Sequence, residues 1–239
     1  MEIVLVRHAQ PDWEPLPAGR AVDDPGLTPL GAEQARLAAK ALAGTEFDAY
    51  YASPLRRVAL TAAPISTVLD REPEVASWLR EIALPRMHGL PPAEVQRLFR
   101  DANARNLSEW WKGMEGGESF RHFYERVSSG IEGLLAGDHR VTIHEGSGHR
   151  LWELPESEKR ILIVAHEGTN AVILSHLLGI EPVPWAWVRF SSAWAGISRL
   201  HTLRVAGGAI WSLESFNRTD HLIPLQSDPG WQRDGRTQV

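Results

Sequence analysis

The chain has 239 residues, a formal net charge of −5 and no cysteine. Its length suits one α/β domain, and its acidic balance argues against a nucleic-acid-binding face. The lack of cysteine excludes a disulfide framework, a thiolate nucleophile and cysteine-ligated zinc. The N-terminal sequence has neither a basic leader nor a long apolar run, so we expect no signal peptide, no membrane span and a cytoplasmic protein.

Short apolar runs alternate with segments of helical periodicity along the chain. In chain order, the runs predict strands at 2–7, 47–52, 74–80, 160–165, 197–205 and 209–216. The helical segments are 29–43, 54–69, an interrupted insertion over 85–115, 116–135 and 169–178. Thr28 before Pro29 predicts an N-cap, and Ser53-Pro54 repeats this pattern at the next helix.

The alternation of strands and helices predicts an α/β fold. We expect a three-layer sandwich, in which a mostly parallel central sheet has helices on both faces. The prediction is one domain over 1–239, with a helical cap at about 85–125 and a polar tail after about 224. Residues 138–159 carry weak signals, with a short edge strand at 141–143. Three histidines there have a spacing that suits neither a helix face nor a strand face, so they are expected to be solvated loop residues: His139, His144 and His149.

Two predicted strands end directly in a histidine. His8 follows the first strand, and His166 follows the strand at 160–165. Either histidine alone is more simply explained as a core residue. However, ligands of parallel sheets bind at the carboxyl ends of the strands, where we also expect Arg7 and Arg57. Guanidinium groups bind phosphate oxygens in bidentate geometry, so this combination predicts a phosphate-binding pocket.

The order and spacing of several motifs resemble the histidine phosphatase superfamily, the phosphoglycerate mutase-like proteins. Each motif alone is weak, but together they run in order from residue 3 to residue 222. The matching segments are Arg7-His8-Ala9, Leu27 to Ala35, Ser53 to Ala62, Leu79-Arg80-Glu81, Gly116 to Ser119, His166-Glu167-Gly168 and Asn217 to Leu222.

The resemblance implies a phosphoric monoester hydrolase that needs no metal or cofactor and acts on a small phosphorylated metabolite. In such an enzyme His8 attacks phosphorus and forms a phosphohistidine. Arg7, Arg57 and His166 stabilise the phosphoryl oxygens. Glu81 is the expected general acid, which protonates the leaving alcohol and then activates water.

The chain departs from the family pattern close to the nucleophile. Ala9 replaces the usual glycine, and Gln10-Pro11 stands where the family often has Glu-Thr. Glu14 falls where a phosphate-binding asparagine is common, and Glu167 directly follows the second histidine. Gln10, Glu14 and Glu167 are expected to contact the substrate. The two acids either meet a positive or hydroxyl-rich part of it or point away from the pocket.

Three alternative functions remain open at this stage. The first is phosphoglycerate-mutase-type phosphoryl transfer, and the second is a non-catalytic domain that binds a phospholigand. The third is other chemistry on an anionic substrate. No nucleic acid or membrane is expected as a partner. The ten tryptophans are expected mainly in the core, with some at pocket walls or at the interface of a homodimer.

Overall fold

The computed structural model describes residues 1–13, 21–146 and 149–226, and the predicted tail lies largely outside these ranges. Eight strands within them form one sheet, in the order β3-β2-β6-β1-β7-β8-β5-β4. The strands are β1 (Glu2–Arg7), β2 (Ala49–Ala52), β3 (Glu74–Val75), β4 (Thr142–Gly146), β5 (His149–Glu153), β6 (Arg160–Ala165), β7 (Ile197–Val205) and β8 (Gly208–Arg218). The helices are α1 (Pro29–Leu42), α2 (Arg56–Leu69), α3 (Pro92–Asn103), α4 (Phe120–Gly137) and α5 (Glu167–Leu177), with short 3₁₀ helices at Ser77–Leu79, Leu107–Lys112, Ala186–Val188 and Asp220–Leu225.

The sheet has a parallel part and an antiparallel part. The neighbours β3, β2, β6 and β1 are parallel, and β7, β8, β5 and β4 continue the sheet with antiparallel pairing. β1 and β6 lie side by side, and each has five buried residues out of six. Such apolar runs are typical of strands that are covered on both faces. The predicted α/β class is confirmed, with the parallel strands beside an antiparallel extension.

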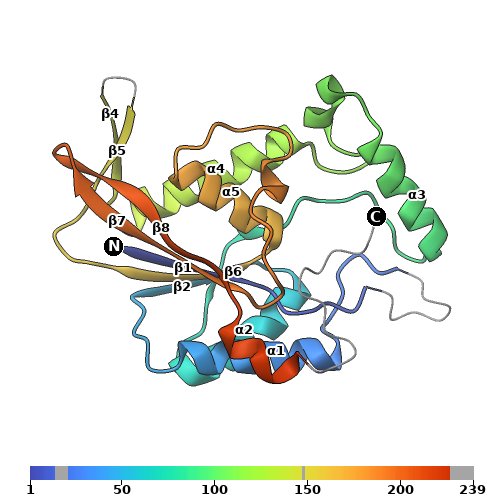
Figure 1. Cartoon of the computed structure of the whole chain (residues 1–239), viewed down its shortest axis with the longest axis horizontal. Helices are drawn as coiled ribbons and strands as arrows, with labels where there is room; N and C mark the ends of the chain where they lie inside the picture. The colour runs from blue at the N-terminus through green and yellow to red at the C-terminus, as the bar shows by residue number, and fades with distance from the viewer. Residues whose placement is uncertain (14–20, 147–148, 227–239) are drawn as a thin grey trace.

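Helices cover the sheet on both faces. In Figure 1, α1 and α2 lie on one side of it, and α4 and α5 lie on the other. Successive residues of β1 point to opposite layers, as a strand requires. Ile3 and Leu5 belong to the core that includes Ile131 of α4. Val4 belongs to the core that includes Ile65 of α2. The alternation of side chains therefore divides one apolar run between two cores.

The two predicted helix caps have different outcomes. Thr28 caps α1 as predicted, because its hydroxyl accepts a hydrogen bond from the N–H of Gly31 at 2.9 Å. Ser53 does not cap α2, so this prediction is wrong. The N-cap residue there is Leu55, and the N–H of Arg56 in the first turn donates to the Asp24 carboxylate at 3.1 Å. The Ser53 hydroxyl instead lies 2.8 Å from Nε2 of His166.

Two segments differ from the sequence-based expectation. The strand expected at 74–80 is only two residues long and gives way to a 3₁₀ helix. The segment 138–159 forms the hairpin β4–β5 instead of a single short edge strand. His139 is buried rather than solvated, and its Nε2 lies 3.3 Å from the Tyr51 hydroxyl. His144 is exposed as expected, and the side chain of His149 is outside the described part of the structure.

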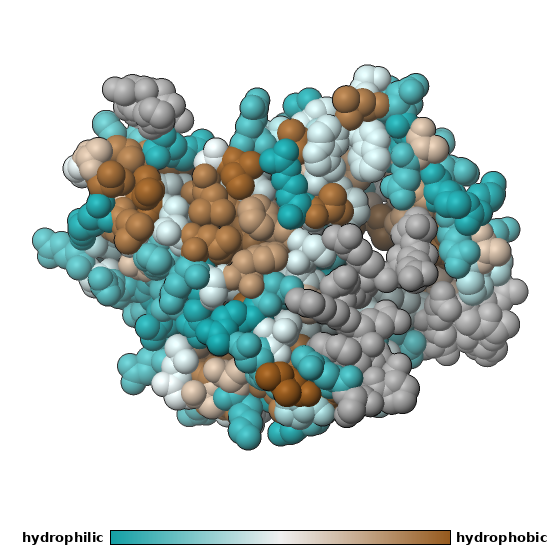
Figure 2. All heavy atoms as spheres, viewed as in Figure 1, coloured by the Kyte–Doolittle hydropathy of each residue, from teal (hydrophilic) through white to brown (hydrophobic). Residues whose placement is uncertain are grey.

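The surface has an apolar area on the antiparallel part of the sheet. Figure 2 shows apolar residues gathered over the antiparallel part of the sheet, and the β7–β8 hairpin exposes Leu203, Val205 and Ile210. Within the described ranges, no helix combines the length and the apolar character needed to cross a membrane.

Candidate active site

Three strand ends meet at one edge of the sheet. His8 follows β1, Ser53 follows β2, and His166 follows β6, which lies between those strands. The N–H of His8 donates to the Ala165 carbonyl oxygen at 2.9 Å, and the N–H of Ser53 donates to the Val164 carbonyl oxygen at 3.1 Å. The ring centroids of the two histidines are 5.2 Å apart. The sheet register therefore brings together two histidines that are far apart in the sequence.

The His8 ring is held in one tautomer. Its Nδ1 lies 2.8 Å from the carbonyl oxygen of Ala9, and a carbonyl only accepts hydrogen bonds, so Nδ1 carries the proton. Nε2 then has a lone pair, and Nε of Arg57 lies 3.3 Å from it. Burial and the charges of Arg57 and Arg7 hold the pKa of His8 well below its usual value of 6.5. The ring is therefore neutral near pH 7, with an unprotonated Nε2.

Arg7 and Arg57 bring two buried guanidinium groups to this edge. Arg7 ends β1, donates to the carbonyl oxygen of Ser192 and pairs with Glu167 at 3.1 Å. Arg57 lies in the first turn of α2, and its Nη1 is 3.6 Å from a carboxylate oxygen of Asp24. Burial lowers the pKa of both arginines from its ordinary value. Arginine stays charged in proteins, so the edge keeps two positive groups.

Buried polar atoms without a hydrogen-bond partner occur on these same side chains. Among the described residues, Nε of Arg7, Nη1 of Arg57 and Nδ1 of His166 are buried and have no such partner. Burial and the neighbouring charges also hold the pKa of His166 well below 6.5. An unsatisfied buried donor destabilises a fold by about 1–3 kcal/mol. Three such atoms at one edge fit a ligand with several acceptor oxygens.

Glu81 comes to the site from a segment that precedes the helical insertion. Its carboxylate accepts hydrogen bonds from the N–H of Gly168 at 2.9 Å and from the N–H of Ile82 at 3.1 Å. Burial raises its pKa above 4.5, although these N–H groups and both arginines work in the opposite direction. The carboxyl group therefore lies at the first turn of α5, two residues along the chain from His166.

Glu167 is fully engaged by protein groups. One carboxylate oxygen pairs with Arg7, and the other accepts from the Ser191 hydroxyl at 3.0 Å and from the Ser192 N–H at 3.2 Å. Its negative charge is therefore compensated by an arginine. The acid ties the end of β1 to the loop before β7, which the sequence did not indicate.

Gln10 and Glu14 have different places in the structure. The Gln10 side-chain oxygen accepts a hydrogen bond from the Thr28 hydroxyl at 2.7 Å, and its backbone N–H donates to Gln34 at 2.9 Å. Gln10 thus connects the nucleophile loop to the start of α1. Glu14 lies outside the described residues.

Three residues at this edge were missed by sequence reasoning. Ser53, against His166, was interpreted as a helix cap. Asp24 and Trp13 lie near Arg57, and the Trp13 ring centroid is 5.1 Å from the guanidinium carbon. Both belong to a loop with no periodic pattern. The only available signal was the position of that loop directly after the nucleophile.

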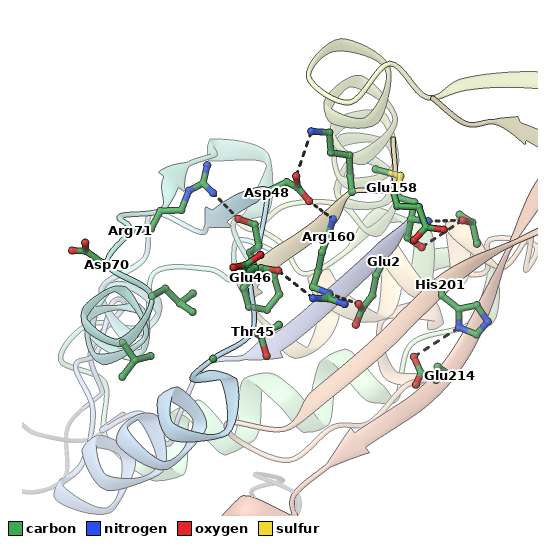
Figure 3. Close-up of a pocket in the computed structure, with 17 residues that line it drawn as sticks. Glu2, Thr45, Glu46, Asp48, Asp70, Arg71, Glu158, Arg160, His201 and Glu214 are labelled. Atoms are coloured by element: carbon green, nitrogen blue, oxygen red, sulfur yellow. Dashed lines mark hydrogen bonds and ion pairs between the residues drawn. The ribbon is translucent and has the colours of Figure 1, made fainter. Parts of the chain in front are cut away.

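A cavity lies elsewhere, at the opposite ends of the central strands. It has a volume of about 1120 Å³, and its lining includes Glu2 at the start of β1 and Arg160 at the start of β6 (Figure 3). Two ion pairs join charged groups of its lining: Arg160 with Glu2, and Lys159 with Asp48 at 3.3 Å. No metal-binding group of three or more His, Asp or Glu residues occurs in the described ranges. The unsatisfied buried nitrogens of Arg7, Arg57 and His166 lie instead at the strand-end site.

In this α/β fold, two histidines and two buried arginines lie at the carboxyl ends of the strands. Such a site is typical of a protein that binds phosphate groups. The family model described as histidine phosphatase superfamily (branch 1) matches residues 3–217. The chain belongs to this superfamily, and the prediction made from its motifs is confirmed.

Several known proteins are similar to the chain. Phosphoserine phosphatase 1 of Hydrogenobacter thermophilus is 32% identical over 133 residues, which cover 55% of this chain and 63% of that relative's length. Putative phosphoserine phosphatase 2 of the same organism is 31% identical over 179 residues, which cover 74% of this chain and 79% of the relative. The solved structure of mycobacterial glucosyl-3-phosphoglycerate phosphatase has a TM-score of 0.66 and 25% identity, and covers 91% of this chain and 99% of that one.

Proposed function

We propose that the chain is a phosphatase that hydrolyses a small phosphomonoester through a phosphohistidine on His8, without a metal ion. The observation that carries the proposal is the set of buried nitrogen atoms that lack hydrogen-bond partners on Arg7, Arg57 and His166, beside a histidine whose Nε2 is unprotonated. A phosphoryl group has three non-bridging oxygens that accept hydrogen bonds from such donors.

The first step forms the phosphoenzyme. Nε2 of His8 donates its lone pair to phosphorus, while the bond from phosphorus to the leaving oxygen breaks. Arg7, Arg57 and His166 hold the three equatorial oxygens and offset their charge. The raised pKa of Glu81 favours its protonated form. Glu81 gives this proton to the leaving oxygen.

The second step releases phosphate. Glu81, now ionised, takes a proton from a water molecule, and the water oxygen attacks phosphorus. The nitrogen–phosphorus bond breaks, and its electron pair returns to Nε2 of His8. The site is then in its starting protonation state, with neutral His8 and protonated Glu81.

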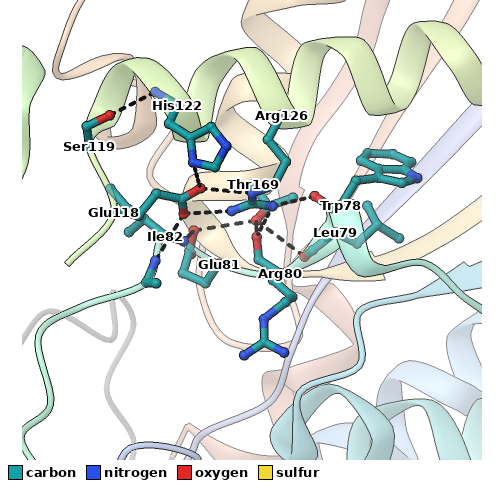
Figure 4. Close-up of polar contacts among 11 residues, drawn as sticks. Trp78, Leu79, Arg80, Glu81, Ile82, Glu118, Ser119, His122, Arg126 and Thr169 are labelled. Carbon is teal, nitrogen blue, oxygen red and sulfur yellow. Dashed lines mark hydrogen bonds and ion pairs between the residues drawn. The ribbon is translucent and has the colours of Figure 1, made fainter.

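Arg80 is the residue that leads us to propose a second anionic group on the substrate. Its exposed side chain points away from Glu118 and Arg126 (Figure 4). Burial, and more weakly the charges of Arg7 and Arg80, lower the pKa of Arg57, so the Arg80 charge acts at the phosphate pocket. Phosphoserine and glucosyl-3-phosphoglycerate, for which two relatives are named, both carry a carboxylate beside the phosphate ester. We therefore extend the proposal to phosphate esters of small carboxylic acids.

Substitution of Arg80 tests this substrate class. Arg80→Ala should raise KM for phosphoserine and 3-phosphoglycerate about tenfold, because a hydrogen bond to a charged group contributes about 1.5–3 kcal/mol. KM for phosphoethanolamine, which has no carboxylate, should not change. Arg86→Ala removes another exposed arginine nearby and serves as the matched control. An equal effect on both kinds of ester would contradict the carboxylate assignment.

Several smaller expectations stay proposals. We retain substrate contacts for Gln10 and Glu14, and we propose that Glu167 acts on the substrate by positioning Arg7. A single domain, a homodimer and a cytoplasmic location are also retained. Sedimentation at varied protein concentration tests the homodimer, for which the apolar area over β7 and β8 is a candidate interface.

The experiment for the main proposal measures phosphate release from 4-nitrophenyl phosphate and from a panel of phosphorylated metabolites. The native chain should release phosphate, and His8→Ala should abolish the release. Interconversion of phosphoglycerate isomers faster than release would instead indicate a mutase. Binding of the esters without turnover would indicate a non-catalytic domain. Activity that survives in His8→Ala would refute the nucleophile.

A further inference from the structure

The segment that carries Glu81 has no regular structure of its own. The 3₁₀ helix at Ser77–Leu79 ends just before it, and no helix or strand occurs between Arg80 and Pro91. A catalytic carboxyl group must nevertheless be held within a fraction of an ångström of its productive position. Contacts from other elements therefore have to fix this part of the backbone.

Arg126 of α4 binds the backbone on one side of Glu81. Its Nη1 donates to the carbonyl oxygens of Trp78 at 2.7 Å and Arg80 at 3.1 Å. Figure 4 shows the guanidinium group between the helix and this segment. The two carbonyl groups belong to residues close to Glu81 in the chain, so the position of the guanidinium limits where the carboxyl group can lie.

Glu118 binds the backbone on the other side of Glu81. Its carboxylate accepts from the N–H of Ala83 at 3.2 Å, and its own N–H donates to the Ala83 carbonyl oxygen at 2.7 Å. This close approach requires Gly117, because a Cβ there would lie 2.7 Å from the Ala83 oxygen. Ser119 then caps α4 by accepting from the N–H of His122 at 3.1 Å. The motif over 116–119 thus connects the Glu81 segment to a helix.

Glu118 and Arg126 also hold each other. Two hydrogen bonds of 2.9 and 2.8 Å join the guanidinium group to both carboxylate oxygens. The Glu118 side chain is only 8% exposed. Burial acts to raise its pKa, but the hydrogen bonds from Arg126 and Ala83 and the charge of Arg126 outweigh burial, so the pKa of Glu118 lies below 4.5. The pair therefore remains ionised and aligned near neutral pH.

We propose that Glu118 and Arg126 are positioning residues for the general acid, and that their ion pair holds the Trp78–Ala83 backbone so that Glu81 reaches the leaving oxygen of the substrate. This inference rests on the proposed phosphatase function. Neither residue touches the phosphoryl group in this account, because both act through the backbone that carries Glu81.

The test uses the dependence of the rate on the leaving group. Arg126→Met removes the donors but keeps much of the side-chain stem. It should lower kcat/KM for an alkyl phosphate about 10- to 100-fold, because general acid catalysis typically contributes about 10²–10⁴-fold and a displaced acid loses part of it. For 4-nitrophenyl phosphate, whose leaving group departs without a proton, kcat/KM should change less than about threefold. The comparison uses kcat/KM because this constant reports the formation of the phosphoenzyme and not its hydrolysis, in which Glu81 also acts as the base. Arg126→Lys, which keeps one charged donor, should restore part of the alkyl phosphate activity.

A double-substitution cycle separates positioning from a general structural role. In a Glu81→Gln background, Arg126→Met should cause no further loss with the alkyl phosphate, since the group through which it acts is absent. Glu33→Gln in the exposed Glu33–Arg36 pair of α1 is the matched control and should leave both rates unchanged. If Arg126→Met does not fold, Arg126→Lys and Glu118→Gln give the same comparison.

Two results would overturn this inference. One is an equal loss for both leaving groups in a folded variant, and the other is an additive loss in the double variant. Failure of the proposed function has a different signature, because the native chain itself would then release phosphate from neither ester.

Discussion

Gly168 offers a way to displace Glu81 without touching the nucleophile or the arginines. A Cβ built at Gly168 would lie 2.6 Å from Oε1 of Glu81. A carbon–oxygen contact requires about 3.3 Å, so the carboxyl group would have to retreat by about 0.7 Å. The atom that must move is the end of a flexible side chain. Gly168 also lies in the first turn of α5 and does not have a left-handed backbone, so alanine fits its conformation.

Gly168→Ala should therefore keep the fold and lose general acid catalysis. Alanine is a better helix former than glycine by about 1 kcal/mol, so the melting temperature should stay level or rise. A misplacement of about 1 Å costs on the order of 100-fold in rate, so kcat/KM for an alkyl phosphate should fall about 10- to 100-fold. With 4-nitrophenyl phosphate, kcat/KM should stay within about threefold of the native value, because that leaving group needs no proton.

The assay compares kcat/KM for the two esters in Gly168→Ala and in the native chain. Gly133→Ala is the matched control, because Gly133 is also helical and a Cβ there would meet nothing within 4 Å. The control should leave both rates unchanged. Native activity of Gly168→Ala on the alkyl phosphate, or an equal loss on both esters, would refute the assignment of Glu81 as the acid.

Three further predictions follow from the charges and hydrogen bonds of the site. The pKa of His8 is held well below 6.5. We therefore expect kcat/KM for an aryl phosphate, after correction for ionisation of the substrate, to stay constant down to about pH 6. A fall of kcat/KM with a midpoint near the ordinary histidine pKa would contradict this. Burial raises the pKa of Glu81 above 4.5, so its ionisation destabilises the native chain as pH rises. The melting temperature of Glu81→Gln should therefore rise relative to that of the native chain between pH 5 and pH 8. A constant difference between the two melting temperatures would count against the raised pKa. Ser53→Ala removes the hydroxyl 2.8 Å from His166 Nε2 and should lower kcat about tenfold while changing the unfolding free energy by only about 1 kcal/mol, as chemical denaturation would measure.

Much of the fold and part of the site were predictable because they depend on local patterns. β1 and β6 are apolar runs that only a strand covered on both faces can bury, and each ends in a histidine. The Thr28-Pro29 pair defines the start of α1 through contacts within four residues. Arg57 could be placed because it stands in the first turn after a predicted strand.

The remaining features depend on contacts between residues that are distant in the sequence. Ser53 has the sequence context of a helix cap, but its hydroxyl is used by His166, 113 positions away. Glu167 looked like an unexplained acid beside the phosphate, because its contacts with Arg7 and the Ser191-Ser192 loop exist only in the folded chain. His139 is buried against Tyr51 for the same reason. No periodicity in the sequence encodes such pairs.

The most direct test of the central claim is to trap the phosphoenzyme. The native chain is mixed with a phosphate ester, quenched in alkali within the first turnover, and analysed by mass spectrometry of its peptides. We predict one phosphate on His8 that is stable in alkali and lost in acid, and that forms and decays fast enough to account for turnover. Phosphate on His166 instead, or turnover with no phosphoenzyme at any quench time, would contradict the account.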